Sequence, residues 1–262
     1  MSCYSYEIIN ETNNPILKNV DITFILVMEN SRRFKRDPFL LNLSKKTVIQ
    51  YNKGFRACKK PSTILKTNED LNHAYYTVFE YAKNMNNIII CEEDAEVLYY
   101  TKSHYDIVDN YISKDFSGVF SFASHGLFKN LDRNFFAVYS PSGAQANIYS
   151  KQERSKIMRN MESYNFKGHM DAHYLKDNTV VYKHPLIVQL FPETENFKNW
   201  GCNKYITRLA IKIIGLDKKK SGWEILYILS KIRGQIYYNN MFLIFILSLL
   251  VLFIYRKKSI LK

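Results

Sequence analysis

A continuous apolar run from Ile22 to Met28 constrains the fold of this chain more than any other feature. A run without alternation is typical of a strand that is covered on both faces, as in the middle of an α/β sheet. Thr47 to Tyr51 and Ile88 to Cys91 are two further short strand candidates. Because a helical pattern separates the last two, we expect strands and helices to alternate around a mostly parallel central sheet.

An amphipathic helix is predicted between the second and third of these strands. Thr67 and Asp70 have the spacing of a capping box at its start. Its apolar residues recur at helical spacing and predict one face that packs on the sheet. They are Leu71, Ala74, Tyr75, Val78, Phe79 and Ala82.

More elements of the same kind follow. Val119 to Ala123 and Phe135 to Tyr139 are strand candidates, and Ser150 with Glu153 forms a second capping box before another helix. The 262 residues are 47% hydrophobic and contain only 9 glycines and 6 prolines. This composition favours one packed domain without a flexible linker, which we place at residues 21–205 after an extension at 1–20.

The four cysteines, at positions 3, 58, 91 and 202, are far apart and include no CxxC pair. This distribution predicts neither a zinc site nor a disulfide framework. The first 14 residues have no apolar core, so no secretory signal is expected. Together these features predict a folded domain in a reducing compartment, the cytosol.

The net charge of +13 calls for an anionic partner or a solvated basic surface. Polyphosphate ligands, nucleic acid and an anionic membrane are the candidate partners. Much of the excess lies near the C-terminus, beside the apolar run Met241 to Tyr255, which favours a membrane surface.

Residues 237–255 approach the roughly 20 residues that cross a bilayer, and we predict a transmembrane helix there rather than a buried core helix. A basic amphipathic membrane-proximal segment at 206–236 and a basic tail at 256–262 complete this arrangement. The chain is then a single-pass membrane protein with a C-terminal anchor and a cytosolic domain, in a host cell or virion membrane if it is viral.

Glu92, Glu93 and Asp94 directly follow the strand candidate that ends at Cys91. Open α/β sheets bind ligands at the carboxyl ends of their strands. Two carboxylates there can share Mg²⁺ or Mn²⁺, and the cation would hold a diphosphate and stabilise it as a leaving group. Taken alone, the triplet could equally be a solvated acidic turn.

Several segments, in this order, resemble the family 25-type glycosyltransferases and related proteins of large DNA viruses. The resemblance covers roughly residues 22–201. Two departures are Glu93, where the family has Asp, and the absence of the family's histidine near Gln145. The matching segments are Asp70-Leu71-Asn72-His73, Ile90-Cys91-Glu92-Glu93-Asp94, Ser142 to Ser150, Met170-Asp171, Lys183 to Gln189, and Thr194-Glu195-Asn196 with Trp200.

The resemblance implies a Rossmann-like domain of the A type that carries out metal-dependent transfer of a hexose from a UDP-sugar to a hydroxyl of a protein or glycan, with inversion. It implies Asp94 as a ligand of Mn²⁺ or Mg²⁺, joined by Glu92. Glu92 or Glu93 would otherwise contact the ribose of the nucleotide. Asp171 is the candidate general base.

Arg32 and Arg33 follow the first strand, where a guanidinium could bind the diphosphate of the nucleotide-sugar. A solvated basic loop is the alternative. The alternative function is a membrane-tethered, non-catalytic protein of the same fold that binds polyphosphate or nucleic acid. No specific nucleic-acid recognition is expected, because the chain lacks interleaved aromatic and basic residues of that kind.

Overall fold

The structure is a computed structural model that describes residues 2–31, 33–113, 115–143, 145–175, 178–189, 209, 212–213, 215 and 220–260. For residues 220 and 244–260 it describes the backbone without the side chains.

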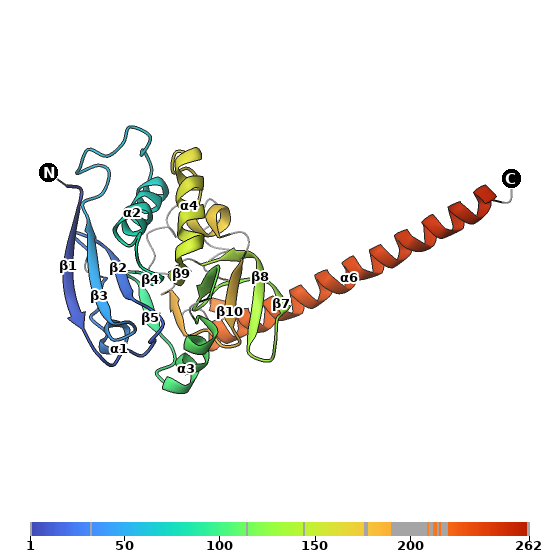
Figure 1. The fold of residues 1–262 in the computed structure, drawn as a ribbon, viewed down its shortest axis with the longest axis horizontal. Coiled ribbons are helices and arrows are strands. Elements are labelled where there is room, and N and C mark those ends of the chain that lie inside the picture. Colours follow the sequence, from blue (N-terminus) through green and yellow to red (C-terminus); the bar gives the residue numbers. More distant parts are fainter. Residues whose placement is uncertain are drawn as a thin grey trace.

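Within these residues, nine strands form one sheet in the order β1-β3-β2-β4-β9-β6-β10-β8-β7 (Figure 1). A separate two-stranded sheet pairs β5 with β11. The strands are β1 (Tyr4–Glu11), β2 (Ile22–Met28), β3 (Lys46–Asn52), β4 (Asn87–Glu92), β5 (Ala95–Val97), β6 (Val119–Ser121), β7 (His125–Asn130), β8 (Phe135–Ser142), β9 (Ala146–Ser150), β10 (Thr179–Tyr182) and β11 (Ile187–Gln189).

The large sheet is mixed. β3–β2, β2–β4 and β6–β10 are parallel pairs, whereas the other neighbours in the sheet are antiparallel. The prediction of a mostly parallel, Rossmann-like sheet is therefore wrong. The reason is physical: an apolar run reports that both faces of a strand are covered, not the direction of its neighbours. β9 runs antiparallel between β4 and β6, and a short turn joins β7 to β8.

Helices cover both faces of this sheet (Figure 1). α2 and α4 pack on one face, and α1 and α3 lie on the other. The described helices are α1 (Pro38–Leu41), α2 (Thr67–Tyr81), α3 (Lys102–Tyr111), α4 (Lys151–Ser163), a π-helical turn η1 (Met170–Tyr174) and α6 (Lys220–Ile260).

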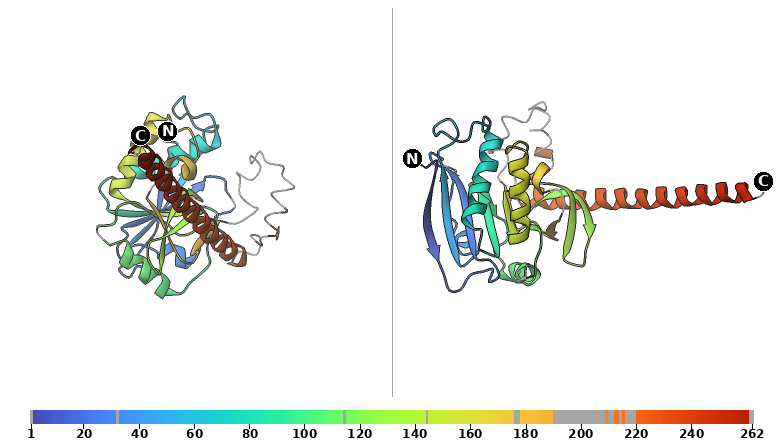
Figure 2. Two further views of the ribbon diagram at one scale, coloured as in Figure 1. Left: turned by 90° about the vertical axis from the view of Figure 1, so that its right-hand side faces the viewer. Right: turned by 45° about the horizontal axis from the view of Figure 1, so that its top comes forward.

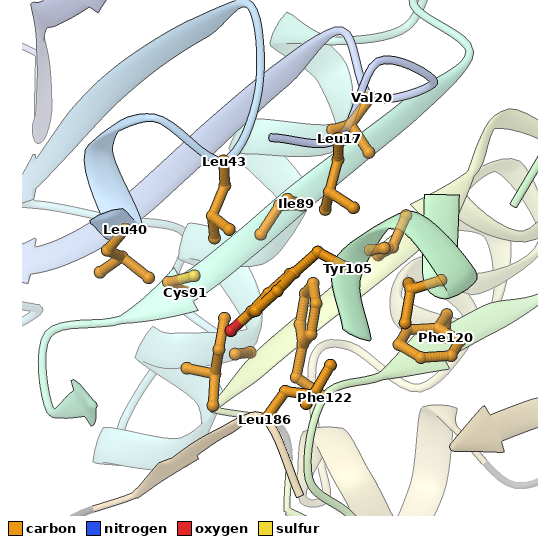
Figure 3. Packing of buried hydrophobic residues seen from close by; sticks show 14 of the residues in the cluster. Leu17, Val20, Leu40, Leu43, Ile89, Cys91, Tyr105, Phe120, Phe122 and Leu186 are labelled. Carbon is orange, nitrogen blue, oxygen red and sulfur yellow. The ribbon is translucent and has the colours of Figure 1, made fainter. Parts of the chain in front are cut away.

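Strand β2 shows why its sequence is apolar throughout. Phe24 and Leu26 point to the face under α2, and Ile25 and Val27 point to the opposite face. Both sets are buried, as expected for a central strand between two helical layers. Figure 3 shows the second face. Its labelled residues are Leu17, Val20, Leu40, Leu43, Ile89, Cys91, Tyr105, Phe120, Phe122 and Leu186.

Arg154 of α4 fastens the end of α2 to the sheet. Its guanidinium donates to the backbone carbonyls of Ala82 and Met85, at 3.0 and 2.6 Å, and to those of Asn86 and Tyr149, at 2.8 and 2.9 Å. The side chain is buried, and burial lowers its pKa to about 10. Carbonyls that helix α2 leaves unsatisfied at its C-terminus thereby gain a donor.

We expect Arg154→Met to lower the free energy of unfolding by about 3 kcal/mol or more, because four backbone carbonyls lose a charged donor. Urea denaturation followed by circular dichroism measures this change. Arg159→Met is the matched control, because Arg159 is an exposed residue of the same helix. A loss of less than about 0.5 kcal/mol for Arg154→Met would mean that these carbonyls are satisfied by water instead.

Cys3 and Cys58 form a disulfide, with their Cα atoms 5.6 Å apart. The distribution of cysteines predicted no disulfide framework, and it did not reveal this disulfide. A separation of 55 residues leaves no spacing signal in the sequence, whereas the pairing of β1 with β3 brings the two cysteines together. The prediction of a reducing compartment therefore loses the support that it drew from the cysteine distribution. Cys91 is a buried thiol, and Cys202 lies outside the described residues.

The first part of α6 packs against the domain, and the rest extends away from it (Figure 2). Trp223 and Tyr227 are buried beside β7 and β8. Gly234 allows α6 to approach the backbone of β7 closely, because a Cβ at this position would lie 2.0 Å from the carbonyl oxygen of Phe128.

No helix among the described residues is long and apolar enough to cross a membrane. This finding contradicts the predictions of a transmembrane helix at 237–255 and of a single-pass membrane location. Up to residue 243, α6 carries Glu224, Lys231 and Arg233, and one side of it serves to pack on the sheet. Side chains 244–255 of the predicted span, and most of the segment 206–219, lie outside the described part of the chain.

Candidate functional site

A pocket opens at the carboxyl ends of the three adjacent parallel strands β3, β2 and β4. These strands end at Asn52, Met28 and Glu92, and the first turns of α2 form the opposite wall. The cavity has a volume of about 100 Å³. Its lining residues are Leu26, Val27, Met28, Arg33, Asn52, Thr67, Asp70, Leu71, Ala74, Glu92, Glu93, Asp94 and Gln189.

Asp94 is a buried residue of the lining whose two carboxylate oxygens differ in their hydrogen bonding. Its side chain is buried, and Oδ2 accepts hydrogen bonds from Gln189 Nε2 at 3.2 Å and Arg33 Nη1 at 3.4 Å. Oδ1 is also buried and has no hydrogen-bond partner among the described residues. Burial raises the pKa of Asp94, although Gln189 and Arg33 oppose the shift.

Glu93 is bound to other parts of the chain. Oε1 accepts from Arg33 Nη2 at 2.5 Å, and Oε2 accepts from the backbone N–H of Met28 at 3.1 Å. These contacts hold the segment after β2 against the triplet. Glu93, where the resembling family has Asp, therefore positions Arg33 in this structure.

Glu92 is held near the buried interior by Tyr75, whose hydroxyl donates to Glu92 Oε1 at 3.3 Å. Burial raises the pKa of Glu92 to about 8, and the charges of Asp94 and Asp171 add to the shift. The negative charge of Asp94 thus repels that of an ionised Glu92 and disfavours its ionisation. A cation between them would relieve that repulsion.

Asp171 lies on the π-helical turn η1, outside the lining of the cavity. Oδ2 accepts from Gly143 N at 3.1 Å and from Ser142 Oγ at 3.4 Å, and Oδ1 accepts from Ala172 N at 2.8 Å. Its charge contributes to the raised pKa of Glu92. Asp171 is partly exposed, as a base that contacts an acceptor must be.

The loop that leads to Asp171 is anchored on α2. Asn72 Nδ2 donates to the carbonyls of Phe166 and Gly168, at 2.7 and 2.9 Å, and Asn68 Nδ2 donates to Gly168 O at 2.9 Å. Phe166 and Gly168 both have positive φ, at 62° and 98°. α2 therefore fixes both a wall of the pocket and the loop before the candidate base.

The residues fit a divalent cation that is shared with a ligand. The cavity lining has four carboxylates and one guanidinium, and Lys60 compensates one of the carboxylates, Asp70, from behind the wall. A dication would offset the negative charge that remains. Among the described residues, no group of three His, Cys, Asp or Glu could hold a metal ion. Mg²⁺ is commonly bound by one or two carboxylates together with waters and substrate phosphates. Asp94 Oδ1 and Glu92 suit that arrangement, not a cage built by protein alone.

Three residues of this region were not predicted to act here. Gln189 of β11 lies opposite Ala95 of β5, and this pairing brings its amide to Asp94. Asn52 ends β3, and Lys60 forms an ion pair with Asp70 behind the pocket wall. Gln189 was visible only as part of the family-like segment. Nothing in the sequence around Lys60 indicates a role.

The predicted cap of α2 also differs in a way that matters for the pocket. Glu69, not Asp70, accepts hydrogen bonds at the start of α2, from Leu65 N at 2.7 Å and Lys66 N at 3.0 Å. Asp70 does not cap the helix and lines the cavity instead. The Ser150 cap of α4 is confirmed, since Ser150 Oγ accepts from Glu153 N at 3.3 Å. Arg32 lies outside the described residues.

No protein-family model and no curated protein matches the chain. Among solved structures, the chain is similar to the crystal structure of A197 from STIV, with a TM-score of 0.37 and 13% sequence identity. The similarity covers 62% of this chain and 81% of that one. At this level the comparison carries no argument about function.

The raised pKa of Glu92 predicts a pH dependence of the metal-free protein. Its carboxyl has an ordinary pKa of 4.5 and a pKa of about 8 in the fold. The protonated form is favoured by folding, so this contribution to stability is complete below about pH 4.5 and is lost as pH rises to about 8. We expect the thermal midpoint to fall from pH 5 to pH 8, and to fall less in Glu92→Gln. Differential scanning calorimetry measures the midpoints. If the thermal midpoints of the wild type and Glu92→Gln changed equally with pH, the raised pKa of Glu92 would be contradicted.

Proposed function

We propose that this chain is a metal-dependent glycosyltransferase that moves a sugar from a nucleotide-sugar, UDP-linked, to a hydroxyl acceptor. One observation carries the proposal. The cavity at the ends of three parallel strands has an apolar wall and an acidic corner formed by Glu92, Glu93 and Asp94, where Asp94 Oδ1 is buried without a hydrogen-bond partner in the part of the chain that the structure describes. The order of the family-like segments along the sequence supports the same function.

The apolar wall and the polar groups next to it suit a nucleoside. Leu26, Val27, Leu71 and Ala74 offer an apolar surface, and Asn52, Thr67 and Asp70 lie beside it with donors and acceptors. Small-molecule sites are commonly built this way, with a mainly apolar lining and a few polar groups that fix orientation. The base and ribose would occupy this part of the pocket.

The acidic corner suits the diphosphate. Mn²⁺ or Mg²⁺ held by Asp94 and Glu92 would stabilise the negative charge that develops on the departing nucleoside diphosphate. Arg33 lies at the same corner, and its guanidinium can offer paired donors to phosphate oxygens. Gln189 and Arg33 keep Asp94 oriented toward this corner through its Oδ2.

Asp171 is the candidate base for the acceptor hydroxyl. Gly143 N and Ser142 Oγ donate hydrogen bonds to Asp171 Oδ2 and hold the carboxylate in place. During transfer, the acceptor oxygen bonds to the anomeric carbon as the bond to the diphosphate breaks, and Asp171 takes the hydroxyl proton. Attack on the face opposite the leaving group gives inversion at the anomeric carbon.

The test is a panel of UDP-hexoses incubated with the full chain and Mn²⁺, with released UDP as the readout. We expect release for at least one sugar, and loss of release when EDTA removes the metal. UDP release at an unchanged rate in the presence of EDTA would exclude the metal-dependent mechanism. Binding of UDP without turnover of any sugar would favour the non-catalytic alternative.

A further inference from the structure

A second cluster of buried polar groups lies directly behind the pocket wall. Lys60 Nζ forms an ion pair with Asp70 and donates to Asn52 Oδ1 at 2.7 Å. Asn52 Nδ2 donates to Asp70 Oδ2 at 3.1 Å. The side chains of Lys60 and Asp70 are only 2% and 5% exposed. Because Asn52 and Asp70 both line the cavity, the position of Lys60 sets the charge and orientation of that wall.

Charge makes this position important for an anionic ligand. Arg33 is the only cationic side chain in the lining as described, facing Asp70, Glu92, Glu93 and Asp94. Lys60 compensates Asp70 from behind. If its ammonium left, the pocket would gain one more uncompensated buried carboxylate, which would repel a nucleoside diphosphate across a short, poorly screened distance.

A disulfide lies close to Lys60 along the chain. Lys60 is in the loop 53–66 between β3 and α2, two residues after Cys58, which is bonded to Cys3. The ring of Tyr4, next to Cys3, lies 4.3 Å from Lys60 Nζ. Ile64 is buried, but much of the loop around Lys60 is exposed. The disulfide is thus the covalent attachment of a loop with many exposed residues to the start of β1.

We propose that the Cys3–Cys58 disulfide is a redox-sensitive device that fixes Lys60 in the pocket wall, so that its reduction lowers the affinity of the pocket for a nucleoside diphosphate. The affinity part rests on the proposed function. A dithiol reductant supplies two electrons and two protons. The S–S bond breaks, each cysteine becomes a thiol, and the reductant is oxidised to its own disulfide. The loop 53–66 then loses its bond to the start of β1.

The experiment uses the full chain, oxidised or reduced with dithiothreitol that is then removed without air. Calorimetric titration with UDP in Mn²⁺ measures affinity, and hydrogen–deuterium exchange measures opening of residues 53–66. We expect reduction to weaken UDP binding by about 10-fold and to speed exchange in this loop. The Cys3→Ser/Cys58→Ser double variant should have the UDP affinity and the loop exchange rate of the reduced protein, and neither value should change on addition of the reductant.

Lysine variants separate the role of Lys60 from a general effect of the loop. Lys60→Met should bind UDP weakly in both redox states, and Lys60→Arg should recover part of the affinity. Lys59→Met removes the same charge from an exposed neighbour and should keep the affinity and redox response of the wild type.

Equal UDP affinity of the oxidised and reduced proteins, or equal exchange of residues 53–66, would overturn the proposed device. A lack of UDP binding by the oxidised wild-type protein would instead contradict the proposed function. Faster exchange of the loop on reduction would then still support the fixing of Lys60 by the disulfide.

Discussion

Asp94→Asn is expected to weaken Mn²⁺-dependent binding of UDP by about 100-fold or more, while the fold is retained. The amide keeps an oxygen that can accept from Gln189 and Arg33, but it removes the negative charge that a cation requires. Because burial already raises the pKa of Asp94, its charge disfavours the metal-free fold. The thermal midpoint of the metal-free variant should therefore equal or exceed that of the wild type. Calorimetric titration and thermal denaturation measure the two quantities.

Asp106→Asn is the matched control, because Asp106 is an exposed carboxylate on α3. It should leave UDP affinity unchanged. If Asp94→Asn kept wild-type affinity in Mn²⁺, the cation would not be held at Asp94. If it lost affinity together with a large fall in stability, the effect would be one of folding, and the assignment would lack its main support.

Asp171→Asn is expected to lower the turnover number for sugar transfer by roughly 10² to 10⁴-fold with little effect on UDP affinity. Asp171 lies outside the cavity lining, so the donor site should remain intact. The variant keeps an oxygen that can accept from Gly143 N, but it cannot take a proton from the acceptor. Steady-state transfer rates and UDP titrations measure the two effects.

Asp115→Asn, at an exposed position, is the control for this second prediction. A turnover number within about 2-fold of the wild type would exclude Asp171 as the base. A matching loss of UDP affinity would place Asp171 in the donor site instead.

Local features of the fold could be predicted because they depend on short stretches of sequence. β2 coincides with the apolar run Ile22–Met28, and α4 begins after the Ser150 cap. Strand direction could not be predicted, because burial on both faces looks the same in parallel and antiparallel neighbours. β9, which runs antiparallel beside β4, is the element that makes the sheet mixed at its centre.

The candidate site was predictable only in part, for a similar reason. Glu92 ends β4 and Asp94 follows it, while Arg33 comes after the neighbouring strand β2. Residues at the same ends of adjacent parallel strands are expected to meet, as these do in the pocket. Gln189 reaches Asp94 through the β5–β11 pair, which joins residues far apart in the chain. The Lys60–Asp70 ion pair depends on a loop conformation that no periodic pattern encodes.

Long-range covalent and tertiary links account for the other corrections. Cys3 and Cys58 meet only because β1 forms the edge of the sheet beside β3. The start of α6 is a packing helix because Trp223 and Tyr227 find partners on β7 and β8. Hydropathy along the chain could show neither contact.

The most direct test of the metal-binding pocket is anomalous diffraction at the manganese edge, from crystals of the full chain grown with UDP and Mn²⁺. We expect one peak within bonding distance of Asp94 Oδ1 and a Glu92 carboxylate oxygen, with UDP phosphate oxygens completing the coordination. UDP bound elsewhere, or a manganese peak away from Asp94, would contradict it.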